Sequence, residues 1–292
     1  MINENDGLSI INGIVRCSEN KIDLSKIENL ESLMKTYPPM DVYKKYHLNL
    51  SEKNNNDENL NSLLFMNLLF QDCSNYIAAN QSEIKKTHQF RLGAIGKISF
   101  RLIEITDENL ALLRNGFGTS VISNLRLMLE SFSISKYLMS AEDIESDKFQ
   151  DFGIVQECKI HNTDSKKKLK GKNYTEDFFN AKSDFAWISD KKVKTPVDLI
   201  NRIEIEEIKD WYKFYCKYAH ASPYSCGKVF QMNQSSLEND NAYIPIGMKE
   251  LIQQNKYYLA LTIELIADNF ILDELRREMF KKVSLLIYNF KK

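Results

Sequence analysis

Polar side chains that can bind a ligand or move a proton recur at helical spacing between residues 120 and 140. They lie three or four residues apart and therefore share one face of a predicted helix: Ser123, Arg126, Glu130, Ser133 and Tyr137. Arg126 precedes Glu130, which is the reverse of the order that best stabilises a helix. This order favours a polar site. A solvated helix surface is the alternative interpretation of the same pattern.

A second stretch, residues 207–220, is aromatic and basic and ends on His220, one of four histidines in the chain. Three lysines follow one another at four-residue steps: Lys209, Lys213 and Lys217. Trp211, Tyr215 and Tyr218 form an aromatic stripe beside them. Lysines can hold phosphates and rings can stack on bases, so this helix is a candidate nucleic-acid surface. A core-facing stripe flanked by lysines is the alternative.

We expect the two helices to contribute to one ligand-binding site, and its candidate residues are Arg126, Glu130, Tyr137, Tyr215 and His220. If the site is catalytic, Arg126, Glu130 and His220 are the candidates. In RNA cleavage, His220 can act as the base for the 2′-hydroxyl, and Arg126 or Lys213 can stabilise the developing phosphorane. A buried polar network with a structural role is a third interpretation.

Metal and cofactor motifs are weak. Cys158 and His161, together with Cys216 and His220, formally make a zinc set, but the sequence has no Cys-x-x-Cys pair. The acidic residues of the predicted helices lack the Glu-x-x-His pairs of a di-iron bundle. The chain also has no glycine-rich phosphate loop, no Gly-x-Ser-x-Gly elbow and no His-Glu-x-x-His helix. We therefore predict neither a metal nor a cofactor.

The composition indicates a protein of the reducing cytoplasm. The 292 residues are 43% hydrophobic, carry 39 basic against 40 acidic side chains, and include five scattered cysteines. The acidic start lacks the basic region of a signal peptide, and acidic residues interrupt the most apolar stretch, residues 257–272. We expect no membrane association. The sequence does not identify a partner, and RNA and another protein are the two candidates.

Few glycines and prolines and a dominant 3.6-residue pattern predict an all-α fold, a multi-helix bundle with a less regular N-terminal segment. In that segment, residues 1–56, we expect a small hairpin at 10–15 and one helix at 24–37. Residues 57–292 are predicted to form a single helical domain. The helices that position the candidate residues are expected near 60–77, 84–114, 120–140, 143–161, 195–219 with a break, and 247–289. A basic loop is expected at 166–172.

Two motifs resemble those of a bacterial family of all-helical domains of unknown function, the one numbered 5677. The first is Arg126-x3-Glu130 within Leu125–Phe132, and the second is the tyrosine-containing helix that closes on His220. Lys217 or Cys216 stands where the family has a serine before the histidine. The resemblance covers about residues 65–230. It implies a helical bundle in which Arg126, Glu130, Tyr215 and His220 converge.

A more distant similarity is to the helical nucleotide-binding and ribonuclease domains shared by higher eukaryotes and prokaryotes, which occur in toxins and phage defence. Their active members carry an arginine four to six residues before a histidine, whereas Arg202 is the nearest arginine before His220. The leading hypothesis is therefore a cytosolic binding or interaction protein in bacterial stress or phage defence. A metal-independent endoribonuclease is the alternative.

Overall fold

The computed structural model describes residues 58–114, 117–219 and 247–290, and eleven helices and no strand occur in those ranges. The predicted all-α bundle is confirmed. The hairpin at 10–15 and the helix at 24–37 lie outside the described residues, and a single domain over 57–292 stays a prediction. None of the described helices is long and apolar enough to cross a membrane.

The described residues form two compact units. Unit 1 contains residues 58–79, 100–129, 212–219 and 247–290, and unit 2 contains residues 80–99 and 130–211. Three helices each contribute residues to both units: α6 (Arg91–Arg114), α7 (Gly118–Ser140) and α12 (Glu206–Ala219). The predicted polar stripe on α7 is therefore divided between the units.

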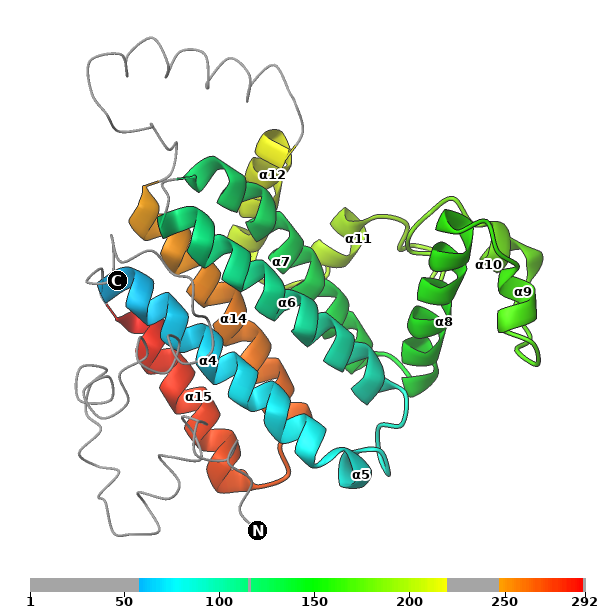
Figure 1. The fold of residues 1–292 in the computed structure, drawn as a ribbon, viewed down its shortest axis with the longest axis horizontal. Coiled ribbons are helices and arrows are strands. Elements are labelled where there is room, and N and C mark those ends of the chain that lie inside the picture. Colours follow the sequence, from blue (N-terminus) through cyan, green and yellow to red (C-terminus); the bar gives the residue numbers. More distant parts are fainter. Residues whose placement is uncertain (1–57, 115–116, 220–246, 291–292) are drawn as a thin grey trace. The chain divides into compact units, whose positions relative to one another are not determined.

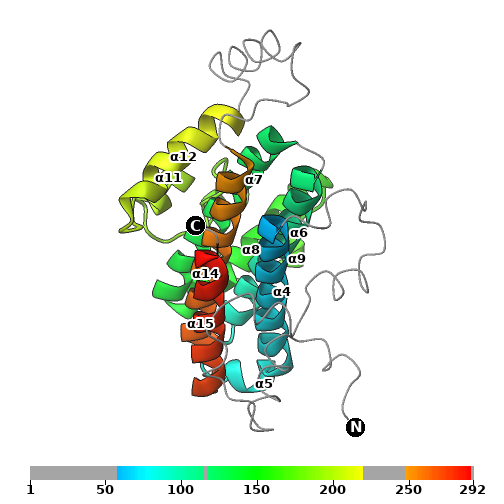
Figure 2. The same cartoon turned by 90° about the vertical axis from the view of Figure 1, so that its left-hand side faces the viewer.

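In unit 1, helices α4 (Glu58–Ala79), α14 (Met248–Phe270) and α15 (Glu274–Asn289) pack against one another (Figures 1 and 2). The middle of α4 is buried on nearly every side, which is typical of a helix surrounded by protein. Its fully buried apolar side chains are Leu63, Leu64, Phe65, Met66, Leu69, Phe70 and Cys73, and the polar Asn67 is buried among them. This helix supplies much of the core of unit 1.

The single helix predicted over 247–289 is wrong, because the chain turns between α14 and α15 at Ile271–Asp273. The Asp273 carboxylate accepts a hydrogen bond of 2.9 Å from the backbone N–H of Arg276. An aspartate that accepts from the first turn in this way caps a helix N-terminus. The cap starts α15 as a separate helix, which lies back along α14.

The helix predicted from residue 84 begins instead at Arg91, after the single turn of α5 (Gln81–Ile84). Its start is fixed by Asp143, the first residue of α8 (Asp143–Ile160). The Asp143 carboxylate accepts hydrogen bonds from the backbone N–H groups of Phe90, at 3.0 Å, and Arg91, at 2.8 Å. The partner is 52 residues away from Arg91, so no local pattern reveals this cap.

Replacing Asp143 by alanine removes both acceptors from the start of α6, and we expect the unfolding free energy to fall by about 1–2 kcal/mol. Urea unfolding followed by circular dichroism measures this. Asp164→Ala is the matched control, because Asp164 caps only the single exposed turn α9 (Ser165–Lys168). Equal stability of the two variants would show that Asp143 does not stabilise α6.

The three helices that follow α8 in the chain are short. Helices α9 and α10 (Glu176–Asn180) contact α8, and α11 (Pro196–Ile200) starts at the predicted Thr195-Pro196 step. The Asp198 carboxylate accepts from the Thr195 backbone N–H at 2.9 Å, which is half of a capping box. The expected break follows at residues 201–205, before α12.

Candidate functional site

Tyr215 lies in the interior of unit 1 and has no exposed surface. Its hydroxyl donates to Gln254 Oε1 at 3.0 Å and lies 2.9 Å from the hydroxyl of Tyr258. Burial raises the pKa of Tyr215 above its ordinary value. In the described structure this hydroxyl therefore bonds to α14 and does not reach solvent.

Arg126 and Glu130 both lie on α7, as the periodicity predicts, and both are half-buried. The Arg126 guanidinium carbon lies 5.7 Å from the ring centroid of Tyr212 in unit 1, a cation–π distance. Glu130 belongs to unit 2. His220 lies outside the described residues, so the convergence of Arg126, Glu130, Tyr215 and His220 stays a prediction.

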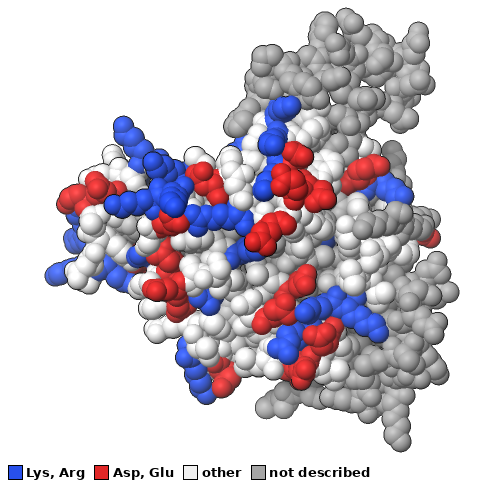
Figure 3. Space-filling model, turned by 180° about the vertical axis from the view of Figure 1, so that it is seen from behind, with Lys and Arg blue, Asp and Glu red and all other residues white. Residues whose placement is uncertain are grey.

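The lysines of α12 do not share one environment. Lys209 forms a 2.8 Å ion pair with Glu206, whereas Lys213 and Lys217 are exposed. In the basic segment 166–172, Lys166 pairs with Glu176, and Lys172 pairs with Asp147 and Asp151. Acidic side chains lie among the basic ones on the face drawn in Figure 3. A nucleic-acid surface stays a prediction.

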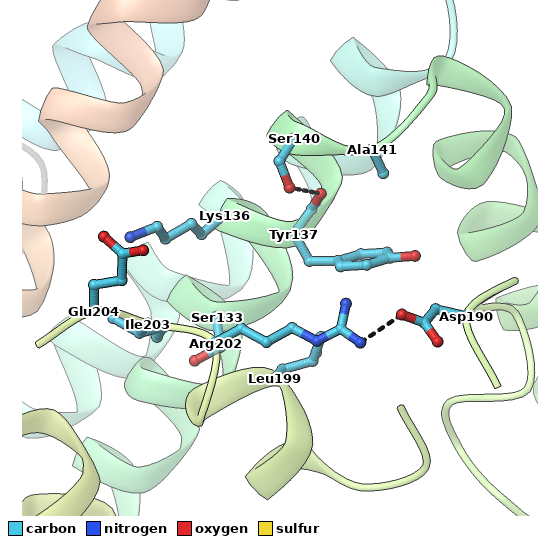
Figure 4. A pocket seen from close by; sticks show the side chains of 10 residues that line it. All are labelled: Ser133, Lys136, Tyr137, Ser140, Ala141, Asp190, Leu199, Arg202, Ile203 and Glu204. Carbon is cyan, nitrogen blue, oxygen red and sulfur yellow. Dashed lines mark hydrogen bonds and ion pairs between the residues drawn. The ribbon is translucent and has the colours of Figure 1, made fainter. Parts of the chain in front are cut away.

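Tyr137 lies at a pocket of about 530 Å³ within unit 2 (Figure 4). The lining comes from the C-terminal end of α7, the loop at Asp190, helix α11 and the break before α12. The residues that line it are Ser133, Lys136, Tyr137, Ser140, Ala141, Asp190, Leu199, Arg202, Ile203 and Glu204. This volume is in the range of small-molecule sites, roughly 300–1,000 Å³.

One hydrogen bond and one ring contact outside the pocket hold the Tyr137 side chain in place. Its hydroxyl donates to Glu145 Oε2 at 3.3 Å, and its ring meets Trp187 edge to face with centroids 5.7 Å apart. Burial and the neighbouring Glu145 raise the pKa of Tyr137 to about 12. The phenol therefore stays protonated at neutral pH and presents a neutral ring to the pocket.

Glu145 also anchors the loop that carries Asp190. This buried carboxylate accepts from the backbone N–H of Ser189 at 2.8 Å, from its hydroxyl at 2.5 Å, and from Lys148 Nζ at 2.8 Å. Burial opposes the charge of Glu145, but the bonds from Lys148 and Ser189 outweigh it and hold its pKa below the ordinary value. The wall of the pocket formed by Asp190 is thereby fixed to α8.

The charged side chains of the pocket fall into two sets. Arg202 Nη2 lies 2.6 Å from Asp190 Oδ2, and this bond is the main cause that lowers the pKa of Asp190. Lys136 and Glu204 form no hydrogen bond or ion pair within the described ranges. The pocket therefore contains one closed ion pair and two charges that a ligand can bind.

Of the five predicted ligand-binding residues, Tyr137 lines this pocket. The polar stripe on α7 also contains Ser133. Steps of three residues from Ser133 and from Tyr137 reach Lys136 and Ser140, so helical spacing can find these two as well. Asp190, Arg202 and Glu204 follow no motif in the sequence. No group of three metal-binding side chains occurs within residues 58–114, 117–219 and 247–290.

The structure thus defines an all-helical protein with a small polar pocket. Residues 92–236 match the model of a family of unknown function, DUF5677, over just under half of the chain. This is the family that the Arg126-x3-Glu130 and His220 motifs resemble. All ten pocket residues lie within the matched range. Neither the comparison with curated proteins nor that with solved structures gives a match.

Proposed function

We propose that this chain is a binding protein whose ligand is a small polar organic molecule, held in the pocket of unit 2. The observation that carries the proposal is the pocket itself, in which a fixed aromatic ring, two hydroxyls and charges of both signs surround about 530 Å³. Tyr137 is both a ligand-binding residue predicted from the sequence and a residue that lines the pocket.

The lining matches what small-molecule recognition requires. Leu199 and Ile203 are buried apolar residues that cover the hydrocarbon part of a ligand, and the Tyr137 ring offers a face for stacking. Lys136 and Glu204 are placed to fix its orientation. Because Glu145 and Trp187 hold Tyr137 from behind, little ordering is required when a ligand binds.

A pocket-filling substitution tests this function. Ser140 is an exposed pocket residue, and we expect Ser140→Trp to occupy the space that a ligand needs. In ligand-observed NMR with a library of small polar aromatic compounds, wild-type binders should lose their signal changes with Ser140→Trp. Ser120→Trp, an equally exposed position of α7 outside the pocket, is the matched control and should keep them. If no compound distinguishes the two variants, the pocket is not a binding site.

A further inference from the structure

Two opposite charges without a partner share the pocket. Lys136 extends from α7 and Glu204 from the break before α12, and in the view of Figure 4 both reach the same end of the cavity. Neither makes a hydrogen bond or ion pair with any other residue in the part of the chain that the structure describes. An ammonium and a carboxylate are therefore both available there.

The other two charged residues of the pocket, Asp190 and Arg202, already have partners. Asp190 and Arg202 already neutralise each other at 2.6 Å. Asp190 is itself fixed by its neighbour Ser189, whose backbone and hydroxyl bond to Glu145. A ligand gains less from these two charges, because each already has the other as its partner.

The charges of the lining balance, with Lys136 and Arg202 against Asp190 and Glu204. A simple anion that binds Lys136 leaves Glu204 without a partner, and a simple cation that binds Glu204 leaves Lys136 without one. A molecule that carries both charges can pair with both side chains. Opposite charges without a partner in one pocket are complementary to that kind of molecule.

We propose that the pocket binds a zwitterion of the amino-acid class, and this inference rests on the proposed function. Its carboxylate binds Lys136, and its ammonium group binds Glu204. Its side chain is apolar or aromatic, because Tyr137, Leu199 and Ile203 supply the uncharged wall. The inference thus names the ligand class of the same site.

Three probes of nearly equal size separate the charges: phenylalanine, 3-phenylpropionate, which lacks the ammonium group, and 2-phenylethylamine, which lacks the carboxylate. Titration followed by NMR gives the three dissociation constants. Wild-type protein should bind phenylalanine about fivefold more tightly than either analogue, which is the upper range for a solvent-accessible ion pair. The Glu204→Gln variant should bind phenylalanine and 3-phenylpropionate equally tightly. The Lys136→Met variant should bind phenylalanine and 2-phenylethylamine equally tightly.

The outcomes distinguish this inference from the proposed function. If 3-phenylpropionate binds as tightly as phenylalanine and Ser140→Trp abolishes both, the zwitterion is wrong and the pocket still binds small molecules. If none of the three probes binds although library compounds do, the amino-acid class is wrong. If neither the probes nor the library bind in a way that depends on Ser140, both proposals fail together.

Discussion

Replacing Asn109 by leucine is expected to lower the unfolding free energy by about 2–4 kcal/mol, because it leaves two buried or half-buried amides without their partner. Asn109 has no exposed surface, and its Nδ2 donates to Asn255 Oδ1 at 2.6 Å. Its Oδ1 accepts from Asn124 Nδ2 at 2.9 Å. This chain of amides joins α6, α7 and α14 inside unit 1.

The double variant Asn109→Leu, Asn255→Leu makes the test specific. Asn255 is also fully buried, so its single substitution leaves the Asn109 amide without an acceptor. Replacing both partners by apolar side chains of similar size removes the unsatisfied groups of the Asn109–Asn255 pair, and we expect the double variant to be more stable than Asn109→Leu alone and to lose less than the sum of the two single losses. Urea unfolding of the four proteins measures the coupling. If the unfolding free energies lost by the two single variants simply add in the double variant, the hydrogen bond between the two amides is not the cause of the loss.

The periodicity of the sequence predicts the helices well where local signals decide their ends. The capping sequence at Thr195-Pro196 and the apolar stripe of α4 are examples. Two boundaries were wrong. The Asp143 carboxylate starts α6 from a distant part of the chain, which local reasoning does not see. Asp273 is of a residue type that caps helices, but the apolar residues around it continue the helical pattern, so the turn was not predicted.

The candidate site shows the same difference between local and tertiary information. Tyr137 and Ser133 are on a face that helical spacing identifies. Arg202 and Glu204 contribute to the pocket because α11 and the break after it lie beside α7, and no spacing within one element predicts that neighbour. Tyr215 carries a polar group at helical spacing too, yet Tyr258 and Gln254 bind its hydroxyl inside unit 1. Spacing identifies a face and does not say what covers it.

A buried lysine in unit 1 gives the second large prediction. Lys256 is 1% exposed, and its Nζ donates to the backbone carbonyls of Ile287, at 3.2 Å, and Phe290, at 3.1 Å. These carbonyls lie at the C-terminal end of α15, where a positive charge is favourable. Burial nevertheless dominates, and with a contribution from Lys249 it lowers the pKa of Lys256 from 10.5 to about 8. The folded protein therefore disfavours the charged form.

The stability of the wild-type protein should consequently depend on pH through Lys256. Between about pH 8 and 10.5 the unfolded chain holds a proton that the folded protein has released, so the contribution of Lys256 to the unfolding free energy rises with pH across this range. From pH 7.5 to 9.5 the rise is about 2 kcal/mol. Groups whose pKa values are raised by burial act in the opposite direction: Cys73 above about pH 9, and Tyr215 and Tyr258 above about pH 10.

Substituting Lys256 by methionine removes this titration and keeps most of the side-chain volume. Relative to the wild type, Lys256→Met should be most stable at pH 7.5 and should lose about 2 kcal/mol of that relative stability by pH 9.5. Comparing the two proteins by urea unfolding cancels the other titrating groups. Lys282→Met, at an exposed lysine of α15, is the matched control. The difference in unfolding free energy between this variant and the wild type should not change with pH. A constant difference for Lys256→Met as well would mean that Lys256 remains charged in the folded protein up to its ordinary pKa, with the carbonyls of α15 compensating fully for its burial.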